Sequence, residues 1–148
     1  RRVLFRSLKK ASDELIITTD DGSYGKKGFV TDVLKEKLDN DKTIKRIWTI
    51  GPPIMMKVTV DLTKSYPVKT IVSLNTIMVD GTGMCGSCRL TIGGETKIVC
   101  TDGPEFDGQL VDWNEFMNRV NRYKIEENAA WQNYKNQHRC RCMEESHG

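Results

Sequence analysis

Apolar and polar residues alternate along the first half of the chain in a way that predicts strands and helices in turn. A β-rich apolar run ends in a turn-forming cluster, and two further apolar runs of strand length follow it. Between these runs, apolar residues recur at helical spacing. The predicted order is strand, helix, strand, helix, strand, at residues 15–19, 29–38, 44–50, 54–64 and 68–74. This α/β order is typical of the later half of a doubly wound domain.

The segment 54–64 fits two patterns. Val58, Val60 and Leu62 alternate as they would in a strand, but Ile54 also shares one helical face with Val58 and Leu62. Two prolines precede the segment, and proline is favoured in the first turn of a helix because its missing N–H would be unpaired there anyway. A third strand follows, and parallel strands need a crossover connection. We therefore predict a helix.

From Asn75 the chain becomes rich in glycine and cysteine. Gly93 and Gly94 separate two alternating runs, which predicts a β-hairpin. The stretch 101–108 is rich in turn residues and is expected to be a loop. A long helix is then expected over 112–137.

Asp112 with Glu115 gives this helix a start that resembles a capping box. Its inner part carries an apolar stripe that favours packing within the domain, made of Trp113, Phe116, Met117, Val120 and Tyr123. Its outer part places Trp131 and Tyr134 among charged residues, so we expect this part to dock on a partner subunit.

The first seven residues, RRVLFRS, match the translation of a common sequencing-library adapter. They fit no predicted element, so we interpret them as a foreign stretch and expect the natural sequence to begin near Leu8. The alternative is a short basic strand.

Composition narrows the class of protein. The net charge of the 148 residues is +3 and the charges are scattered, so no nucleic-acid surface is expected. No apolar run approaches the ~20 residues of a membrane span, and no signal peptide is evident. The five cysteines lie in the second half and are odd in number, which fits ligand chemistry in a reduced compartment. We expect a cytoplasmic protein.

The cysteines of the glycine-rich stretch have a diagnostic spacing. Asp80 lies five positions before Cys85, Cys88 follows after two residues, and Cys100 after eleven more. With a cysteine at position 80 this would be the ligand pattern of plant-type 2Fe–2S proteins. Aspartate keeps the negative charge of the missing thiolate and offers an oxygen donor. Three loop glycines, Gly81, Gly83 and Gly86, allow the backbone to wrap closely and turn its amides toward sulfide.

Other interpretations of this stretch stay open at this point. Zinc could use the two loop cysteines and Cys100, with His138, Cys140 or Cys142 as the fourth ligand. A redox dithiol is a further alternative, although that motif needs no third cysteine. Asp80 could simply be a turn residue before a glycine.

A second glycine-rich loop follows the first predicted strand and opens a helix. In a doubly wound sheet this edge binds ligands. Asp20 or Asp21 could accept hydrogen bonds from a ribose, and Ser23 with nearby glycine amides could approach a phosphate or a nicotinamide. The glycines in question are Gly22, Gly25 and Gly28. A plain turn is the alternative.

The stretch 73–113, SLNTIMVDGTGMCGSCRLTIGGETKIVCTDGPEFDGQLVDW, closely resembles the small flavoprotein subunit of NADH-dependent ferredoxin:NADP oxidoreductases. The related electron-transfer subunit of dihydroorotate dehydrogenases is the alternative. The stretches 18–34 and 51–56 match the same family, so the resemblance spans Leu8 to Arg122. It implies 2Fe–2S ligation by Asp80, Cys85, Cys88 and Cys100; the dihydroorotate relative has four cysteines, so Asp80 favours the first branch.

The stretch GPPIMM resembles an element that ferredoxin-reductase-type domains place beside nicotinamide and flavin. Gly51, Pro52 and Met55 are therefore expected to contact the nucleotide, with Ile50 where that element has cysteine. The resemblance implies that the intact protein passes electrons from NAD(H) through FAD and the cluster to a larger flavoprotein and iron–sulfur subunit. The glycine-rich pyrophosphate loop and flavin barrel of the family are absent from the chain, so the chain alone is expected to be inactive and to bind both nucleotides poorly.

The predicted organisation is a partial NAD-binding α/β domain of ferredoxin-reductase type at 8–74, a small 2Fe–2S loop-plus-hairpin domain at 75–111, and a C-terminal helix and tail at 112–148. The alternative from another class is a zinc-stabilised interaction module.

Overall fold

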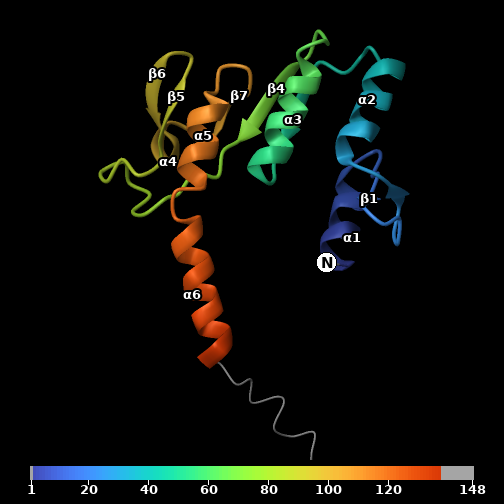
Figure 1. Ribbon diagram of the computed structural model, residues 1–148. Helices are drawn as coiled ribbons and strands as arrows, with labels where there is room; N and C mark the ends of the chain where they lie inside the picture. The colour runs from blue at the N-terminus through green and yellow to red at the C-terminus, as the bar shows by residue number, and fades with distance from the viewer. Residues whose placement is uncertain (1, 138–148) are drawn as a thin grey trace, which may run out of the picture.

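The computed structural model describes residues 2–137 (Figure 1). Its helices are α1 (Arg2–Ala11), α2 (Val30–Asn40), α3 (Pro53–Thr63), α4 (Val99–Asp102), α5 (Trp113–Val120) and α6 (Lys124–Gln137). Its strands are β1 (Thr18–Thr19), β2 (Lys26–Lys27), β3 (Arg46–Thr49), β4 (Lys69–Ser73), β5 (Arg89–Ile92), β6 (Glu95–Ile98) and β7 (Glu105–Asp107). Figure 1 shows α3 and β4 in the middle, α1 and α2 on one side, the β5–β6 hairpin and α5 on the other, and α6 extending away from the body.

The centre of the fold is a βαβ unit, as the sequence predicts. β3 and β4 pair in parallel, with Trp48 opposite Ile71, and α3 forms the crossover between them. The ambiguous segment is helical: Pro53 occupies the first turn of α3, where a missing N–H costs no hydrogen bond. The hairpin prediction is also confirmed, because β5 and β6 pair in antiparallel fashion around Gly93 and Gly94.

The prediction for the first strand is wrong at its start. Only Thr18 and Thr19 form a strand, and they pair in parallel with β2. The loop after β1 folds back along the strand: the Lys26 N–H donates to the Ile17 carbonyl at 2.8 Å and the Gly28 N–H to the Thr19 carbonyl at 3.1 Å, so the loop itself uses hydrogen-bonding groups of the strand. Within the described residues, β3 therefore has β4 as its one sheet partner and keeps an open edge beside the exposed Trp48.

The predicted loop 101–108 contains the end of α4 and the whole of β7. β7 pairs with β4 in antiparallel fashion, with Phe106 opposite Val72, so the sheet order is β3–β4–β7. A strand of three residues is too short to show an alternating pattern in the sequence. This short strand nevertheless joins the cysteine-containing half of the chain to the sheet of the first half.

The first and second halves of the chain contribute to one hydrophobic core. It contains Met56 and Val60 of α3, Val72 and Leu74 of β4, and the following residues of the second half: Cys88, Leu90, Ile92, Val99, Val111, Trp113 and Phe116. The predicted domain boundary at 74/75 therefore lies inside a shared core, and the division into domains stays a prediction.

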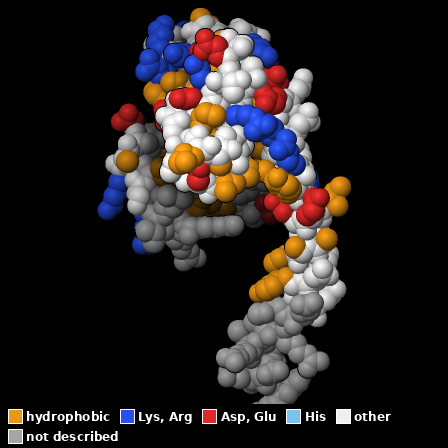
Figure 2. Space-filling model, turned by 90° about the vertical axis from the view of Figure 1, so that its left-hand side faces the viewer, with side chains coloured by type: hydrophobic (Ala, Val, Ile, Leu, Met, Phe, Trp, Pro, Cys, Tyr) orange, Lys and Arg blue, Asp and Glu red, His pale blue; other side chains and the backbone are white. Residues whose placement is uncertain are grey.

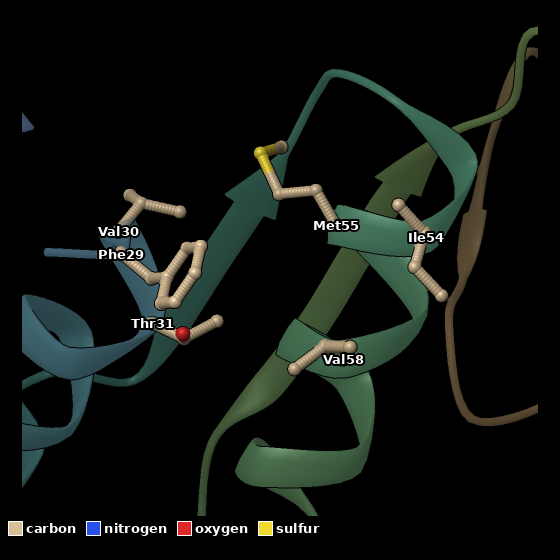
Figure 3. A pocket seen from close by; sticks show the side chains of 6 residues that line it. All are labelled: Phe29, Val30, Thr31, Ile54, Met55 and Val58. Atoms are coloured by element: carbon tan, nitrogen blue, oxygen red, sulfur yellow. The ribbon is translucent and has the colours of Figure 1, made fainter. Parts of the chain in front are cut away.

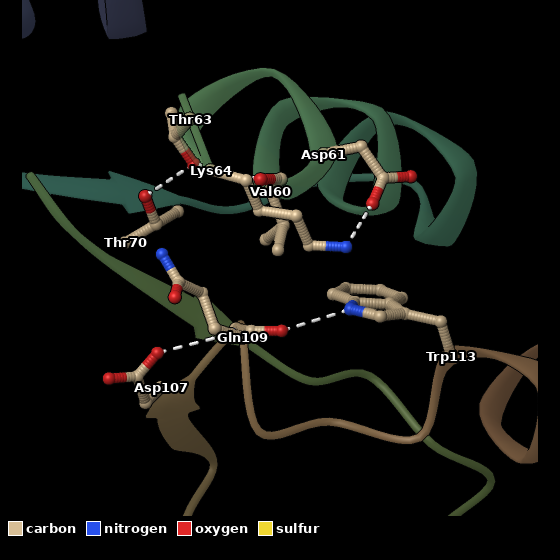
Figure 4. Close-up of polar contacts among 9 residues, drawn as sticks. Val60, Asp61, Thr63, Lys64, Thr70, Asp107, Gln109 and Trp113 are labelled. Atoms are coloured by element: carbon tan, nitrogen blue, oxygen red, sulfur yellow. Dashed lines mark hydrogen bonds and ion pairs between the residues drawn. The ribbon is translucent and has the colours of Figure 1, made fainter. Parts of the chain in front are cut away.

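Polar contacts complete this core (Figure 4). The indole Nε1 of Trp113 donates to the Gly108 carbonyl at 2.9 Å, and the Thr70 hydroxyl donates to the Thr63 hydroxyl at 2.7 Å. Each of these hydrogen bonds satisfies polar groups whose burial without a partner would be unfavourable. Gly108 itself is packed closely, since a Cβ there would lie 2.5 Å from a Val60 methyl group and 2.8 Å from a Val72 methyl group.

The predicted C-terminal helix is divided in two, with α5 ending at Val120 and α6 beginning at Lys124. The apolar stripe ends there too, and Tyr123 is half exposed. The capping box is only half formed: the Asp112 carboxylate accepts from the Glu115 N–H, but Glu115 turns to the Thr91 N–H at 2.9 Å. The described part of the chain contains no helix long and apolar enough to cross a membrane.

The expectation that residues 1–7 fit no element is wrong, and so is the alternative of a short strand. α1 runs without a break from Arg2 to Ala11, and the ring of Phe5 lies 6.4 Å from that of Tyr24. The foreign origin of the stretch stays a prediction.

Gly108→Ala should lower the free energy of unfolding by about 1–3 kcal/mol, because the added methyl group would overpack the contact between α3 and β4. Urea denaturation followed by circular dichroism measures this. Gln109→Ala, one residue along on the exposed surface, is the control and should leave the midpoint unchanged. Equal midpoints for both variants would contradict the packing described here.

Candidate metal centre

The candidate metal ligands lie on the loop between β4 and β5 and on α4. Asp80, Cys85 and Cys88 belong to the loop, and Cys100 lies in the first turn of α4, directly after the hairpin. The hairpin therefore returns the chain to the loop, which places residues twelve positions apart next to each other. The β5–β6 pair fixes this return, with Arg89 opposite Ile98.

Glycines give the loop its course. Gly81, Gly83 and Gly86 have φ values of 74°, 87° and 61°, a region that favours glycine. Gly83 also lies close to α4, since a Cβ there would be 3.0 Å from a methyl carbon of Thr101. The sequence-based role of these glycines, a backbone that wraps tightly around a small site, agrees with these angles.

Asp80 is held at the start of the loop by two backbone donors. Its carboxylate accepts from the Thr82 N–H at 2.9 Å and from the Cys85 N–H at 2.8 Å. The Thr82 hydrogen bond is the main reason that the pKa of Asp80 is lowered, so the group is a carboxylate at neutral pH. Because an ionised carboxylate has about four lone-pair sites, these two bonds leave room for a metal. The turn and the ligand interpretations of Asp80 are therefore compatible.

The three cysteines have different environments. Cys88 is 2 % exposed and belongs to the core, Cys85 is exposed, and Cys100 lies between these extremes. Hydrogen bonding by Ser87, whose N–H lies 3.4 Å from the sulfur, lowers the pKa of the Cys85 thiol. Partial burial raises the pKa of the Cys100 thiol, and its neighbour Cys88 adds to this.

The four groups form two pairs. Asp80 and Cys85 are joined by the hydrogen bond just described, and the Cys100 N–H donates to the Cys88 sulfur at 3.4 Å. The pairs are neighbours, because Gly83 of the loop lies against Thr101, the residue after Cys100. Among residues 2–137, no three His, Cys, Asp or Glu side chains converge as ligands of a single ion.

Two pairs would suit a cluster with two iron atoms, with Asp80 and Cys85 as one pair of ligands and Cys88 and Cys100 as the other. A single tetrahedral zinc would need its ligands around one point. The donor set also fits: three thiols and a carboxylate supply anionic ligands, and the wrapped loop supplies amide N–H groups. The residues present therefore fit a 2Fe–2S cluster. The proposed tail ligands of zinc, His138, Cys140 and Cys142, lie outside the described residues.

The candidate nucleotide-binding residues lie in two places. In the loop after β1, the Asp21 carboxylate accepts the Ser23 N–H at 2.9 Å, which lowers the pKa of Asp21. Gly25 passes so close to Ile17 that any side chain would collide with its carbonyl oxygen. These are contacts of a tight turn. Nucleotide binding by Asp20, Asp21, Gly22, Ser23, Gly25 and Gly28 stays a prediction.

The second place is the start of α3. Pro52 precedes the helix, and Met55 folds over Gly51, where a Cβ would lie 2.5 Å from the Met55 methyl carbon. Figure 3 shows Met55 facing Phe29 and Val30 across a gap between α2 and α3. The gap is a groove of about 320 Å³ whose other lining residues are Thr31, Ile54 and Val58.

The sequence pattern does not predict this groove. Phe29 belongs to one set of helically spaced apolar residues, and Ile54 and Val58 belong to another. Such spacing predicts buried faces, yet all three side chains are exposed. A second hollow of about 230 Å³ adjoins the groove through Val30 and Met55 and follows β3, where Ile47 and Trp48 line it. Apolar surface of this extent on one side of an open strand indicates an incomplete packing layer.

One family model and two known proteins can be compared with this chain. Residues 75–112 match the family model of the iron–sulfur cluster binding domain of dihydroorotate dehydrogenase B. A Clostridium beijerinckii protein, described as an uncharacterized protein in the adh 3′ region, is 56 % identical over 83 % of this chain and 42 % of its own length. The Thermotoga maritima homologue of the dihydroorotate dehydrogenase B (NAD(+)) electron transfer subunit is 44 % identical over 89 % of this chain and 46 % of its own length.

The fold has a solved counterpart. A chain from the structure of an NADH-dependent reduced ferredoxin-NADP oxidoreductase, described for its insight into flavin-based electron bifurcation, is 44 % identical with a TM-score of 0.76. The match covers 86 % of this chain and 46 % of that one. Over most of its own length this chain is therefore similar to a protein described as an electron transfer subunit homologue. It spans less than half the length of the relatives it matches.

In the chain without metal, Cys85 should react with iodoacetamide faster than Cys88 or Cys100, because it is exposed and its thiol has the lowered pKa. Mass spectrometry of peptides from a time course measures the three rates. The same reaction in urea is the control, where the rates should converge. Preferential labelling of Cys88 in the folded chain would contradict the arrangement of the loop.

Proposed function

We propose that this chain is the cluster-bearing part of an electron-transfer subunit of an oxidoreductase, and that it holds a 2Fe–2S cluster through Asp80, Cys85, Cys88 and Cys100. The observation that carries the proposal is the arrangement of these groups as two neighbouring pairs on a glycine-rich loop. The match of residues 75–112 to an iron–sulfur cluster binding domain supports it.

Each element of the site has a distinct part. The buried Cys88 anchors the loop to the core, whereas Asp80 and Cys85 lie at the exposed end. A bound cluster would supply one-electron chemistry that a flavin can couple to the two-electron chemistry of a nicotinamide. The exposed end also carries apolar side chains, Met78, Val79 and Met84, which support contact with a further redox partner.

We infer that the intact protein also binds FAD and NAD(H), and that it passes electrons between NAD(P)H and a larger flavoprotein and iron–sulfur subunit. The names of the relatives support this, because one is an electron transfer subunit homologue and another an NADH-dependent ferredoxin-NADP oxidoreductase. The open edge of β3 and the apolar groove at Phe29, Ile54 and Val58 support a nucleotide-binding domain that is continued by further structure.

The branch within the family rests on Asp80. An oxygen ligand favours the ferredoxin-NADP oxidoreductase type, and the dihydroorotate dehydrogenase type is the second candidate because most of the named relatives carry that name. The exposed Trp131 and Tyr134 on α6, whose rings stack at 5.6 Å, support docking of this helix on the partner subunit in either case.

Iron and acid-labile sulfide analysis of the chain, purified without oxygen, tests the proposal. We expect two iron atoms and two sulfides per chain. Cys88→Ser should abolish the bound iron because it removes the buried ligand, whereas Cys140→Ser, the matched control, should keep it. A colourless preparation with one zinc per chain would instead support a zinc-stabilised interaction module. Equal loss of iron in both variants would mean that the ligands are wrongly assigned.

A further inference from the structure

A small cleft beside the cysteine loop gathers three arginines. It lies between the loop, β5 and the end of α5, and it is lined by Ser87, Arg89, Arg119, Arg122 and Tyr123, with apolar contacts from Ile77 and Val79. Figure 2 views the side of the molecule that carries the hairpin and α5, where basic and apolar groups lie next to each other. Neither the proposed cluster nor the proposed nucleotide site uses these arginines.

The positive charge in the cleft is poorly compensated. The Arg119 side chain is 12 % exposed, and the carboxylate paired with it, that of Glu115, lies 3.7 Å away and already accepts the Thr91 N–H. The Nε atom of Arg119 is buried with no hydrogen-bond partner. A buried donor without a partner is costly, and the guanidinium keeps its positive charge at neutral pH.

Arg89 and Arg122 line the same cleft as Arg119. Arg89 and Arg119 donate to the carbonyls of Gly86 and Ser87, at 3.1 Å and 3.2 Å, and so hold the loop between two candidate cluster ligands. Each guanidinium has five N–H donors, so most remain for a ligand. The Tyr123 ring is half exposed at the rim of the cleft and adds a hydroxyl.

The size of the cleft limits what can bind. Its volume is about 100 Å³, which corresponds to roughly three water molecules in the liquid. A carboxylate or phosphate group fits this space, whereas a nucleotide base does not. Planar, forked donors of arginine match the oxygens of both groups.

We propose that this cleft is an oxyanion-binding site that receives a carboxylate or phosphate group directly beside the cysteine loop. Because the same arginines hold the Gly86 and Ser87 carbonyls, an anion bound there acts on the environment of the loop. The binding step itself rests only on the arginines and is independent of the proposed cluster.

Isothermal titration calorimetry on the full chain at low ionic strength tests the site, with inorganic phosphate and acetate titrated separately. We expect saturable binding of phosphate. Arg122→Gln and Arg89→Gln, both at exposed positions, should each weaken it about tenfold, because each removes charge-assisted hydrogen bonds. Arg46→Gln, an equal charge change on β3 outside the cleft, should leave binding unchanged. If acetate also binds saturably, the site accepts carboxylates as well as phosphate. If phosphate binds and acetate does not, the site is specific for phosphate.

Two results would overturn the proposal: no saturable heat with either anion, or equal weakening by Arg46→Gln, which would indicate a general effect of surface charge. The outcome is distinguishable from that of the proposed function. Phosphate binding by a chain that takes up no iron would leave the cleft in place and reject the cluster. A chain that takes up the cluster but binds neither anion would reject the proposed cleft and leave the proposed cluster in place.

Discussion

The burial of the Cys88 thiol is the constraint on which the rest of the structure depends. Its side chain is 2 % exposed and packs in the same core as Val60, Val72 and Phe116, so one candidate ligand is fixed by the packing of the whole domain. The hairpin then returns Cys100 to it, and the loop glycines bring Asp80 and Cys85 alongside. A ligand that belongs to the core cannot shift without disturbing α3, β4 and α5. The site is therefore rigid at its inner end and open at its outer end.

Much of this arrangement could be predicted from the sequence because it depends on local signals. Proline before α3, the glycine pair of the hairpin and the spacing of the cysteines each act over a few residues. A candidate ligand set could be proposed because coordination chemistry limits which residues can serve and how far apart they lie.

The features that could not be predicted depend on contacts between distant segments. β7 exists because β4 offers it an edge, and three residues carry no pattern of their own. Thr18 and Thr19 pair with Lys26 and Lys27 because the following loop folds back along the strand, and nothing in the apolar pattern indicates this return. The arginine cleft is formed by a loop, a strand and a helix end, and isolated arginines along a sequence give no indication that they converge.

Exposed apolar and basic surfaces lie at three places on the molecule. The open edge of β3 and the groove at Phe29, Ile54 and Val58 lie on one side, and the exposed end of the cysteine loop lies near the arginine cleft on another. α6 extends from the body with Trp131 and Tyr134 exposed (Figure 1). Exposed apolar surface gathered in this way is typical of sites where proteins contact one another.

The central claim is that two ligand pairs of different chemistry hold two iron atoms. Mössbauer spectroscopy of the chain loaded with iron-57 tests this most directly, because it distinguishes iron with four sulfur donors from iron with three sulfurs and one oxygen. The account predicts two quadrupole doublets of equal area in the wild-type chain, and two nearly identical sites in Asp80→Cys. A wild-type spectrum with equivalent iron sites, unchanged by Asp80→Cys, would contradict it.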